Sequence, residues 1–274
     1  MSKISAISGR VLYNSRGSKT IEVDVVSDEK FIGRVCAPSG ASVGKFEAVS
    51  FPNNSPEESL SILNQNSEKF IGIDSNDLKQ VHDVIHSIDD TDNYAKIGGA
   101  CAFAITIATT ESAAKVENKQ FFQMINGKSD FKFPFPLGNI LGGGAHAGPG
   151  TPDIQEILVV SIGAKSVRES IDMNLQVHKE LKKLILKGDP TFTNGRGDEG
   201  GWAPKFNNEE ALDISVKAIE NLGFTLGKEV ALGVDFASST QWNEEKGKYV
   251  YDRAGFENDS GEQIEFASGI IDKY

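Results

Sequence analysis

The stretch LGNILGGGAHAGPGTPDIQEILVVSI, residues 137–162, decides the fold of the second half of this chain. It begins and ends with short apolar runs bounded by glycine or proline, a pattern typical of buried strands. Two helical patterns follow at 166–188 and 207–223, and then another apolar run, VALGVDFAS, at 230–238. The order strand, strand, helix, helix, strand predicts the first part of a TIM-like β/α barrel.

The helices of this region have distinct patterns. The side chains along one face of the first helical pattern are Val167, Ile171, Leu175, His178, Leu181 and Ile185. The second has an asparagine cap and Gly223 at its end, which are ordinary start and stop signals. A last helix is predicted at 262–274, so about three barrel strands fit into the sequence.

The first part of the chain predicts an antiparallel meander followed by helices. The runs ISAISGRVLY, TIEVDVV and FIGRVCA alternate apolar and polar residues and are separated by the turn-like NSRGSK and SDEK. Helical patterns follow at 56–69, 77–88 and 95–117. The last of these is rich in alanine, so we expect it to be the best buried.

A segment punctuated by glycine and proline, NGKSDFKFPFP at 126–136, separates the two patterns and is typical of a linker. We therefore expect an α+β domain at residues 1–126 and a partial β/α barrel domain at residues 134–274. Neither part contains a visible internal repeat or low-complexity tract.

The composition excludes several classes of partner. Acidic residues number 39 and basic residues 28, so at a net charge of -11 the surface would repel a nucleic-acid backbone. The most apolar run, IGGACAFAITIATT at 97–110, is too short to cross a bilayer. Only two cysteines occur, Cys36 and Cys101, and no basic and apolar leader precedes them. We therefore expect a cytoplasmic protein that binds neither nucleic acid nor membranes.

Two motifs that resemble known binding sequences do not fit on inspection. GGGAHAGPG at 142–150 has glycines at dinucleotide-binding spacing, but it runs into Pro149 instead of opening a helix. His82 and His86 would share a helix face, as zinc ligands at that spacing do. Asp83 stands where a zinc protease has glutamate, however, and no third ligand is evident. Neither a nicotinamide site nor a zinc site is predicted.

Five polar side chains in the barrel region are harder to explain as surface residues. His146, Gln155 and Glu156 lie at the ends of consecutive elements, Glu199 lies in the glycine-rich GDEGG, and Asp235 follows an apolar strand. The carboxyl ends of the strands of a β/α barrel face one mouth, so these side chains should converge. Converging acids are costly unless a cation lies among them. The pattern therefore indicates magnesium.

A set of longer motifs spans nearly the whole chain. They are YNSRGSKTIEVDV, APSGASVGKFEA, KIGGACA, GGGAHAG followed by IQEILV, GDEGGWAP and GVDFASS. With these motifs the chain resembles the enolase family, the phosphopyruvate hydratases of glycolysis, and the pair GDEGG and PSGAS is highly specific. It departs from the family in having Ser18-Lys19 for asparagine-proline, Thr240 for glutamate, and a longer loop after His146.

The resemblance implies a lyase that reversibly dehydrates 2-phosphoglycerate to phosphoenolpyruvate. The proton removed lies alpha to a carboxylate, and two Mg²⁺ ions stabilise the ene-diolate, as in other sites of this superfamily. The resemblance also implies a role for each of six side chains. They are Glu199 as the general acid with Glu156 beside it, His146 and Gln155 as substrate-binding residues, and Asp235 and Ser42 as Mg²⁺ ligands.

Some segments of the family are not found in these 274 residues, including those like SIEDP and GDD that hold further Mg²⁺ ligands, and the later lysine base. Four interpretations therefore stay open. They are a truncated or proteolysed enolase, a split enzyme completed by a second polypeptide, a fragment whose catalytic half is not represented, and an inactive enolase-like binding or regulatory module. A partial barrel leaves a strand edge uncovered, so we expect a homodimer or a complex with a complementing C-terminal chain.

Overall fold

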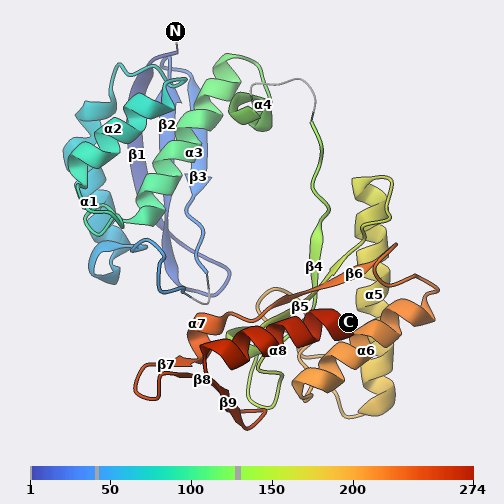
Figure 1. The fold of residues 1–274 in the computed structure, drawn as a ribbon. Helices are drawn as coiled ribbons and strands as arrows, with labels where there is room; N and C mark the ends of the chain where they lie inside the picture. The colour runs from blue at the N-terminus through green and yellow to red at the C-terminus, as the bar shows by residue number, and fades with distance from the viewer. Residues whose placement is uncertain (1, 41–42, 127–130) are drawn as a thin grey trace. The chain divides into compact units, whose positions relative to one another are not determined.

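The computed structural model of the chain describes residues 2–40, 43–126 and 131–274. The chain divides into two compact units, which Figure 1 shows. The first contains Met1–Gly40 and Phe46–Phe131, and the second contains Ala41–Lys45 and Lys132–Tyr274. Each unit has its own apolar core.

The first unit begins with the predicted antiparallel meander. Its strands are β1 (Ile4–Tyr13), β2 (Lys19–Ser27) and β3 (Phe31–Cys36), in the sheet order β1-β2-β3. Both pairs are antiparallel. The alternation in the sequence turns one face of β2 into the core, where Ile21, Val23 and Val25 are fully buried.

Helices cover one face of this sheet (Figure 1). They are α1 (Pro56–Asn66), the 3₁₀ turn η2 (Ser67–Phe70), α2 (Leu78–Ile88), α3 (Gly99–Val116) and α4 (Phe121–Asn126), after a 3₁₀ turn η1 at Pro52–Asn54. The alanine-rich α3 packs on β2 and β3, because its small side chains allow close approach to the sheet. The three predicted helices are confirmed, whereas α4 was not predicted. No helix in the described part of the chain combines the length and the apolar character that a bilayer crossing needs.

The second unit contains three barrel strands. They are β4 (Leu137–Gly142), β5 (Glu156–Val160) and β6 (Ala231–Asp235), in the order β4-β5-β6, so the barrel is not closed in this chain. Both pairs are antiparallel, so β5 runs against both of its neighbours. The prediction that every strand points its carboxyl end to one mouth is therefore wrong for β5, whose first residue lies at that edge.

The helices α5 (Val167–Gly188) and α6 (Asn208–Asn221) pack against each other and against the sheet. Of the six side chains predicted along one face of α5, only Leu181 and Ile185 belong to the core, while Val167, Ile171 and Leu175 are exposed. The buried face is rotated toward Met173 and Val177. Because α5 presents apolar side chains on both faces, its pattern alone does not identify the covered one.

A small sheet follows β6 and was not predicted. After the short helix α7 (Ser238–Gln241), the strands β7 (Trp242–Asn243), β8 (Lys248–Tyr251) and β9 (Phe256–Asn258) form an antiparallel meander. The helix α8 (Ser260–Lys273) ends the chain. These strands have two to four residues, too few for a period-2 pattern to stand out in the sequence.

The N-terminus of α6 generates the first prediction. Asn207 accepts a hydrogen bond from the backbone amide of Glu210 at 2.9 Å, and the Glu210 carboxylate accepts one from the Asn207 amide at 2.9 Å. Replacing Asn207 by alanine breaks this capping box, so the free energy of unfolding in urea should fall by about 1 kcal/mol. Asn221→Ala, at the exposed end of the same helix, should cost less than about 0.5 kcal/mol. Equal losses in the two variants would show that the cap does not stabilise α6.

Candidate active site

The register of the three barrel strands brings acidic residues to one edge of the sheet. Glu156, the first residue of β5, pairs with Gly142 at the end of β4 and with Asp235 at the end of β6. Residues directly opposite each other in an antiparallel pair have their Cβ atoms about 5 Å apart on the same face. The side chains of Glu156 and Asp235 therefore face the same space at this edge.

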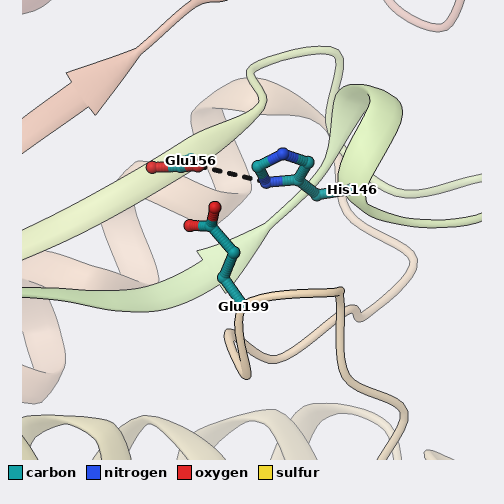
Figure 2. Close-up of side chains that lie close together, drawn as sticks. All are labelled: His146, Glu156 and Glu199. Carbon is teal, nitrogen blue, oxygen red and sulfur yellow. Dashed lines mark ion pairs between the residues drawn. The ribbon is translucent and has the colours of Figure 1, made fainter. Parts of the chain in front are cut away.

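Glu156 forms a compact group with two residues from other segments, and Figure 2 shows the three side chains pointing toward one another. One ligand atom each from His146, Glu156 and Glu199 lies within 4.8 Å of the others. His146 Nδ1 is 3.1 Å from Glu156 Oε1. His146 and Glu156 are buried, whereas Glu199 approaches from the exposed side. The structure thus brings together three of the six side chains that the resemblance singled out.

The environment of Glu156 raises the pKa of its carboxyl group to about 7. Burial is the main cause, since removing a carboxylate from water disfavours its charged form. A hydrogen bond with Glu199 and the negative charges of Glu199 and Asp235 add to the shift. Near neutral pH, Glu156 can therefore hold a proton and donate it to Glu199 or to a bound molecule.

The loop between β4 and β5 positions His146. It contains a single 3₁₀ turn, η3 (Gly144–His146), and buries the histidine so that only 6% of it is exposed. The amide of Gly143 donates to the carbonyl of Gln155 at 2.9 Å, so the two arms of the loop lie against each other. The arm that contains His146 is in this way joined to the arm that leads into Glu156.

The segment that contains Glu199 is held against the edge of β4. Trp202 donates its amide to the carbonyl of Ile140 at 3.0 Å and accepts a hydrogen bond from the amide of Gly142 at 2.9 Å, so it pairs with β4 in parallel. A Cβ on Gly201 would collide with the side-chain oxygen of Asn139, so a larger residue there would require Asn139 to move. The glycines of GDEGG thus allow the segment to approach the strand closely.

The indole of Trp202 packs between the segment that contains Glu199 and helix α5. Its ring stacks on His178 of α5 at a centroid distance of 4.7 Å, and the Arg196 guanidinium lies 4.5 Å from the ring centroid. Trp202 Nε1 donates to the carbonyl of His178 at 2.8 Å, and His178 Nε2 donates to the carbonyl of Gly200 at 3.1 Å. Burial lowers the pKa of His178, with Arg196 nearby, which favours the neutral ring that this arrangement uses. The stack fixes the backbone next to Glu199.

Gln155 and Asp235 lie at the same edge, beside the group of three. Gln155 Nε2 donates to Asp235 Oδ2 at 3.4 Å, and Asp235 Oδ1 accepts a hydrogen bond from the amide of Ala237 at 2.8 Å. Asp235 lies outside the three-residue group that could hold a metal ion. Ser42, predicted as a Mg²⁺ ligand, lies outside the described residues.

Asn139 belongs to the site but was not predicted. Its amide nitrogen donates to Glu199 Oε2 at 3.4 Å, and its side-chain oxygen is buried without a hydrogen-bond partner among the residues that the structure describes. A polar residue inside the otherwise apolar run LGNILGG was the only sequence signal for it. Asn139 lies three residues before the end of β4, within reach of Glu199.

The donor set at this edge fits an oxygen-preferring divalent cation. Glu156, Glu199 and Asp235 offer carboxylate oxygens, the ligands that Mg²⁺ prefers. In the part of the chain that the structure describes, no lysine or arginine forms an ion pair with any of the three. No described lysine or arginine therefore offsets their negative charge, and a cation would relieve their mutual repulsion.

Two family models match consecutive parts of the chain. Residues 4–125 match the enolase N-terminal domain, and residues 130–274 match the enolase C-terminal TIM barrel domain. Both the resemblance that the motifs indicated and the predicted fold class, an α+β unit followed by part of a barrel, are confirmed by these matches.

Several curated relatives from archaea align with nearly the whole chain. The enolases of Methanosphaera stadtmanae and Methanothermobacter thermautotrophicus are each 42% identical over 266 residues, which is 97% of this chain and 64% of each relative. The enolase of Methanocorpusculum labreanum is 38% identical over 276 residues, which is 100% of this chain and 67% of that relative. The chain thus spans about two thirds of the length of these relatives.

The raised pKa of Glu156 generates a prediction about stability. The folded chain holds this proton more tightly than the unfolded chain, in which the pKa has its usual value of 4.5. The stabilisation is present below about pH 4.5 and is lost as the pH rises through about 7. Glutamine stays neutral, so Glu156→Gln should gain stability relative to the wild type between about pH 5 and pH 8, on the order of 1–3 kcal/mol in urea unfolding.

Glu220→Gln is a suitable control, because Glu220 is an exposed glutamate on α6, away from the site. The free energy of unfolding of this variant should equal that of the wild type at about pH 5 and at about pH 8. The difference in free energy of unfolding between Glu156→Gln and the wild type should grow from about pH 5 to about pH 8. If it is the same at these two pH values, Glu156 titrates normally and the prediction is wrong.

Proposed function

Because the chain belongs to the enolase family, we propose that it supplies the proton-donating part of a phosphopyruvate hydratase site. In this reaction 2-phosphoglycerate loses water to give phosphoenolpyruvate, and the reverse reaction adds it back. The observation that supports the proposal best is the carboxyl group of Glu156, whose pKa is raised to about 7 and which lies next to Glu199 and a buried histidine.

Loss of hydroxide from a carbon atom needs an acid that is protonated at working pH and can reach the leaving oxygen. Glu199 is exposed at the mouth and can contact a substrate, whereas Glu156 is buried behind it. We propose that Glu199 donates the proton and that Glu156 replenishes it. Two neighbouring carboxyl groups suit this task because the first negative charge opposes formation of a second.

His146 and Gln155 are proposed to bind the substrate. Both are buried at the same edge, with 6% and 2% of their surface exposed. The Nδ1 atom of His146 lies 3.1 Å from Glu156 Oε1, so the two side chains face the same space. The Nε2 group of Gln155 donates to Asp235, which ties its side chain to the end of β6.

Asp235 is proposed as a Mg²⁺ ligand, together with Ser42. When bound, Mg²⁺ supplies positive charge that stabilises the dianionic form of the substrate. The group of His146, Glu156 and Glu199 offers an alternative cation position. We favour Asp235, because a carboxyl group with a pKa near 7 is partly protonated at neutral pH and is then a poor ligand.

Turnover is proposed to depend on segments of the relatives that lie beyond the part aligned here, since the chain spans 64% of the length of the first two. Those segments would come from a longer form of the polypeptide or from a complementing chain, and a homodimer is also proposed. The exposed apolar side chains of Val167, Ile171 and Leu175 on α5 support burial against such a partner. We propose that the protein works in the cytoplasm.

The main test is phosphoenolpyruvate formation from 2-phosphoglycerate with Mg²⁺. It compares residues 1–274 alone with the full open reading frame and with any complementing chain. In the active form, Glu199→Gln removes the proposed proton donor, so kcat should fall by about 10²- to 10⁴-fold with a small change in KM. Glu220→Gln should leave both constants unchanged. If no combination produces turnover, the enzymatic proposal fails and an enolase-like binding module is the better account.

Mg²⁺ binding generates a separate prediction. A cation at this edge should lower the pKa of Glu156, so the chain should release protons as Mg²⁺ binds at about pH 7. Calorimetric titration in two buffers of different ionisation enthalpy measures this release. Asp235→Asn should weaken binding, and Glu156→Gln should abolish most of the proton release while keeping binding. Binding by the wild type without any proton release would contradict the proposal.

A further inference from the structure

We propose that Arg253 and Asp153 form a clamp that positions the active-site loop between β4 and β5. Arg253 lies in the turn between β8 and β9, and Asp153 lies in the loop itself. Arg253 is then a positioning residue for His146 and Glu156, with no contact to the substrate. The inference rests on the proposed function, because it matters only if these two residues act in the site.

The guanidinium of Arg253 binds both arms of the loop. Its Nη1 atom donates to the carbonyl oxygens of Thr151 at 3.0 Å and Pro152 at 2.7 Å, and to the Thr151 hydroxyl at 2.6 Å. Its Nη2 atom donates to the carbonyl of Gly144 at 3.3 Å. Three acceptors share the two hydrogens of Nη1, so one hydrogen is bifurcated. The planar fork thus joins the arm before His146 to the arm before Gln155.

Asp153 completes the clamp from the opposite side. Its Oδ1 accepts a hydrogen bond from the amide of Arg253 at 3.1 Å, and its Oδ2 accepts one from the amide of Ala254 at 2.9 Å. Only 5% of Asp153 is exposed, and hydrogen bonds to a buried carboxylate are stronger than those between neutral groups. Each charged side chain therefore binds the backbone of the other's segment, which fixes the two segments in one register.

The turn that contains Arg253 packs on a buried group of aromatic side chains. Tyr251 is fully buried, its ring stacks on Phe256 at 4.7 Å, and its hydroxyl accepts a hydrogen bond from Gln263 Nε2 at 2.6 Å. The ring of Phe266 on α8 packs edge-on against two other rings. Its centroid is 5.4 Å from the ring centroid of Tyr251 and 5.7 Å from that of Phe236. Because Phe236 follows Asp235 directly, the aromatic group connects the turn to the end of β6. Through these contacts the clamp can hold the loop between β4 and β5 in a fixed position relative to the end of β6.

The loop has little freedom to absorb a shift of the clamped arm. A Cβ on Gly143 would collide with the carbonyl oxygens of Pro152 and Ile154, so the two arms are in direct contact. Gly144 donates its amide to the carbonyl of Pro152 at 2.8 Å. Moving residues 151–153 therefore moves the segments on both sides. One segment ends at His146 and the other at Glu156.

The experiment uses the full chain with Arg253→Ala, Arg253→Lys, Asp153→Asn and the control Lys246→Ala. Lys246 lies in the turn between β7 and β8 and forms an exposed ion pair with Glu257 of β9, so its removal tests the small sheet without touching the loop. Amide hydrogen exchange of Gly143 and Gly144 reports on the loop, and that of Val177 and Leu181 in α5 reports on the whole unit. Mn²⁺ affinity, followed by the electron paramagnetic resonance signal of free Mn²⁺, reports on the site.

In Arg253→Ala and Asp153→Asn we expect loop exchange to accelerate by about tenfold or more while exchange in α5 stays unchanged. Mn²⁺ affinity should change less than it does in Asp235→Asn, because the favoured ligand Asp235 lies at the end of β6, outside the clamped loop. Arg253→Lys should give intermediate values, because an ammonium cannot reach all the acceptors. Lys246→Ala should match the wild type within about twofold on the reasoning that exposed ion pairs contribute little.

Unchanged loop exchange in Arg253→Ala would overturn the clamp, and so would equal acceleration in α5, which indicates general destabilisation. If Arg253→Ala does not fold, Arg253→Lys and Asp153→Asn decide by the same criterion. A wild type that binds no Mn²⁺ would count against the proposed function alone, because loop exchange would still decide the clamp.

Discussion

The reversed direction of β5 is the constraint on which the site depends. Because β5 runs against both β4 and β6, its first residue lies beside the last residues of its neighbours. Glu156 therefore meets Asp235 across one pair, while the loop that precedes it returns His146 to the same edge. A parallel β5 would place its first residue at the far end of the sheet and would separate these groups by the length of the strand.

As a consequence, three acidic side chains lie close together at a partly buried edge of the β4-β5-β6 sheet. Burial is the main cause of the pKa near 7 for Glu156, and the negative charges of Glu199 and Asp235 add to the shift. A carboxyl group with a basic partner shows the opposite pKa shift: the hydrogen bond from Arg34 lowers the pKa of Asp24. A proton held near neutral pH and a place for a cation are the features that the proposed dehydration requires.

Much of this could be predicted from the sequence, and the failures have physical causes. The alternation in β1 to β3 and the capped pattern of α6 identified those elements, and the placement of the acids at the ends of elements predicted that they converge. The direction of β5 was wrong, because an apolar run does not record which way its strand runs. The buried face of α5 was partly wrong, since Val167, Ile171 and Leu175 are apolar and yet exposed. Asn139 and Arg253 were missed, because their roles arise from contacts between segments distant in sequence.

The most direct measurement is a pH titration of the Glu156 carboxyl carbon by ¹³C NMR, in the wild-type chain and in Glu199→Gln. The account predicts an inflection near pH 7 in the wild type, which moves toward the usual range of glutamate when the charge of Glu199 is removed. An inflection near the usual value of 4.5 in both proteins would contradict it, because Glu156 would then not share its proton at this edge.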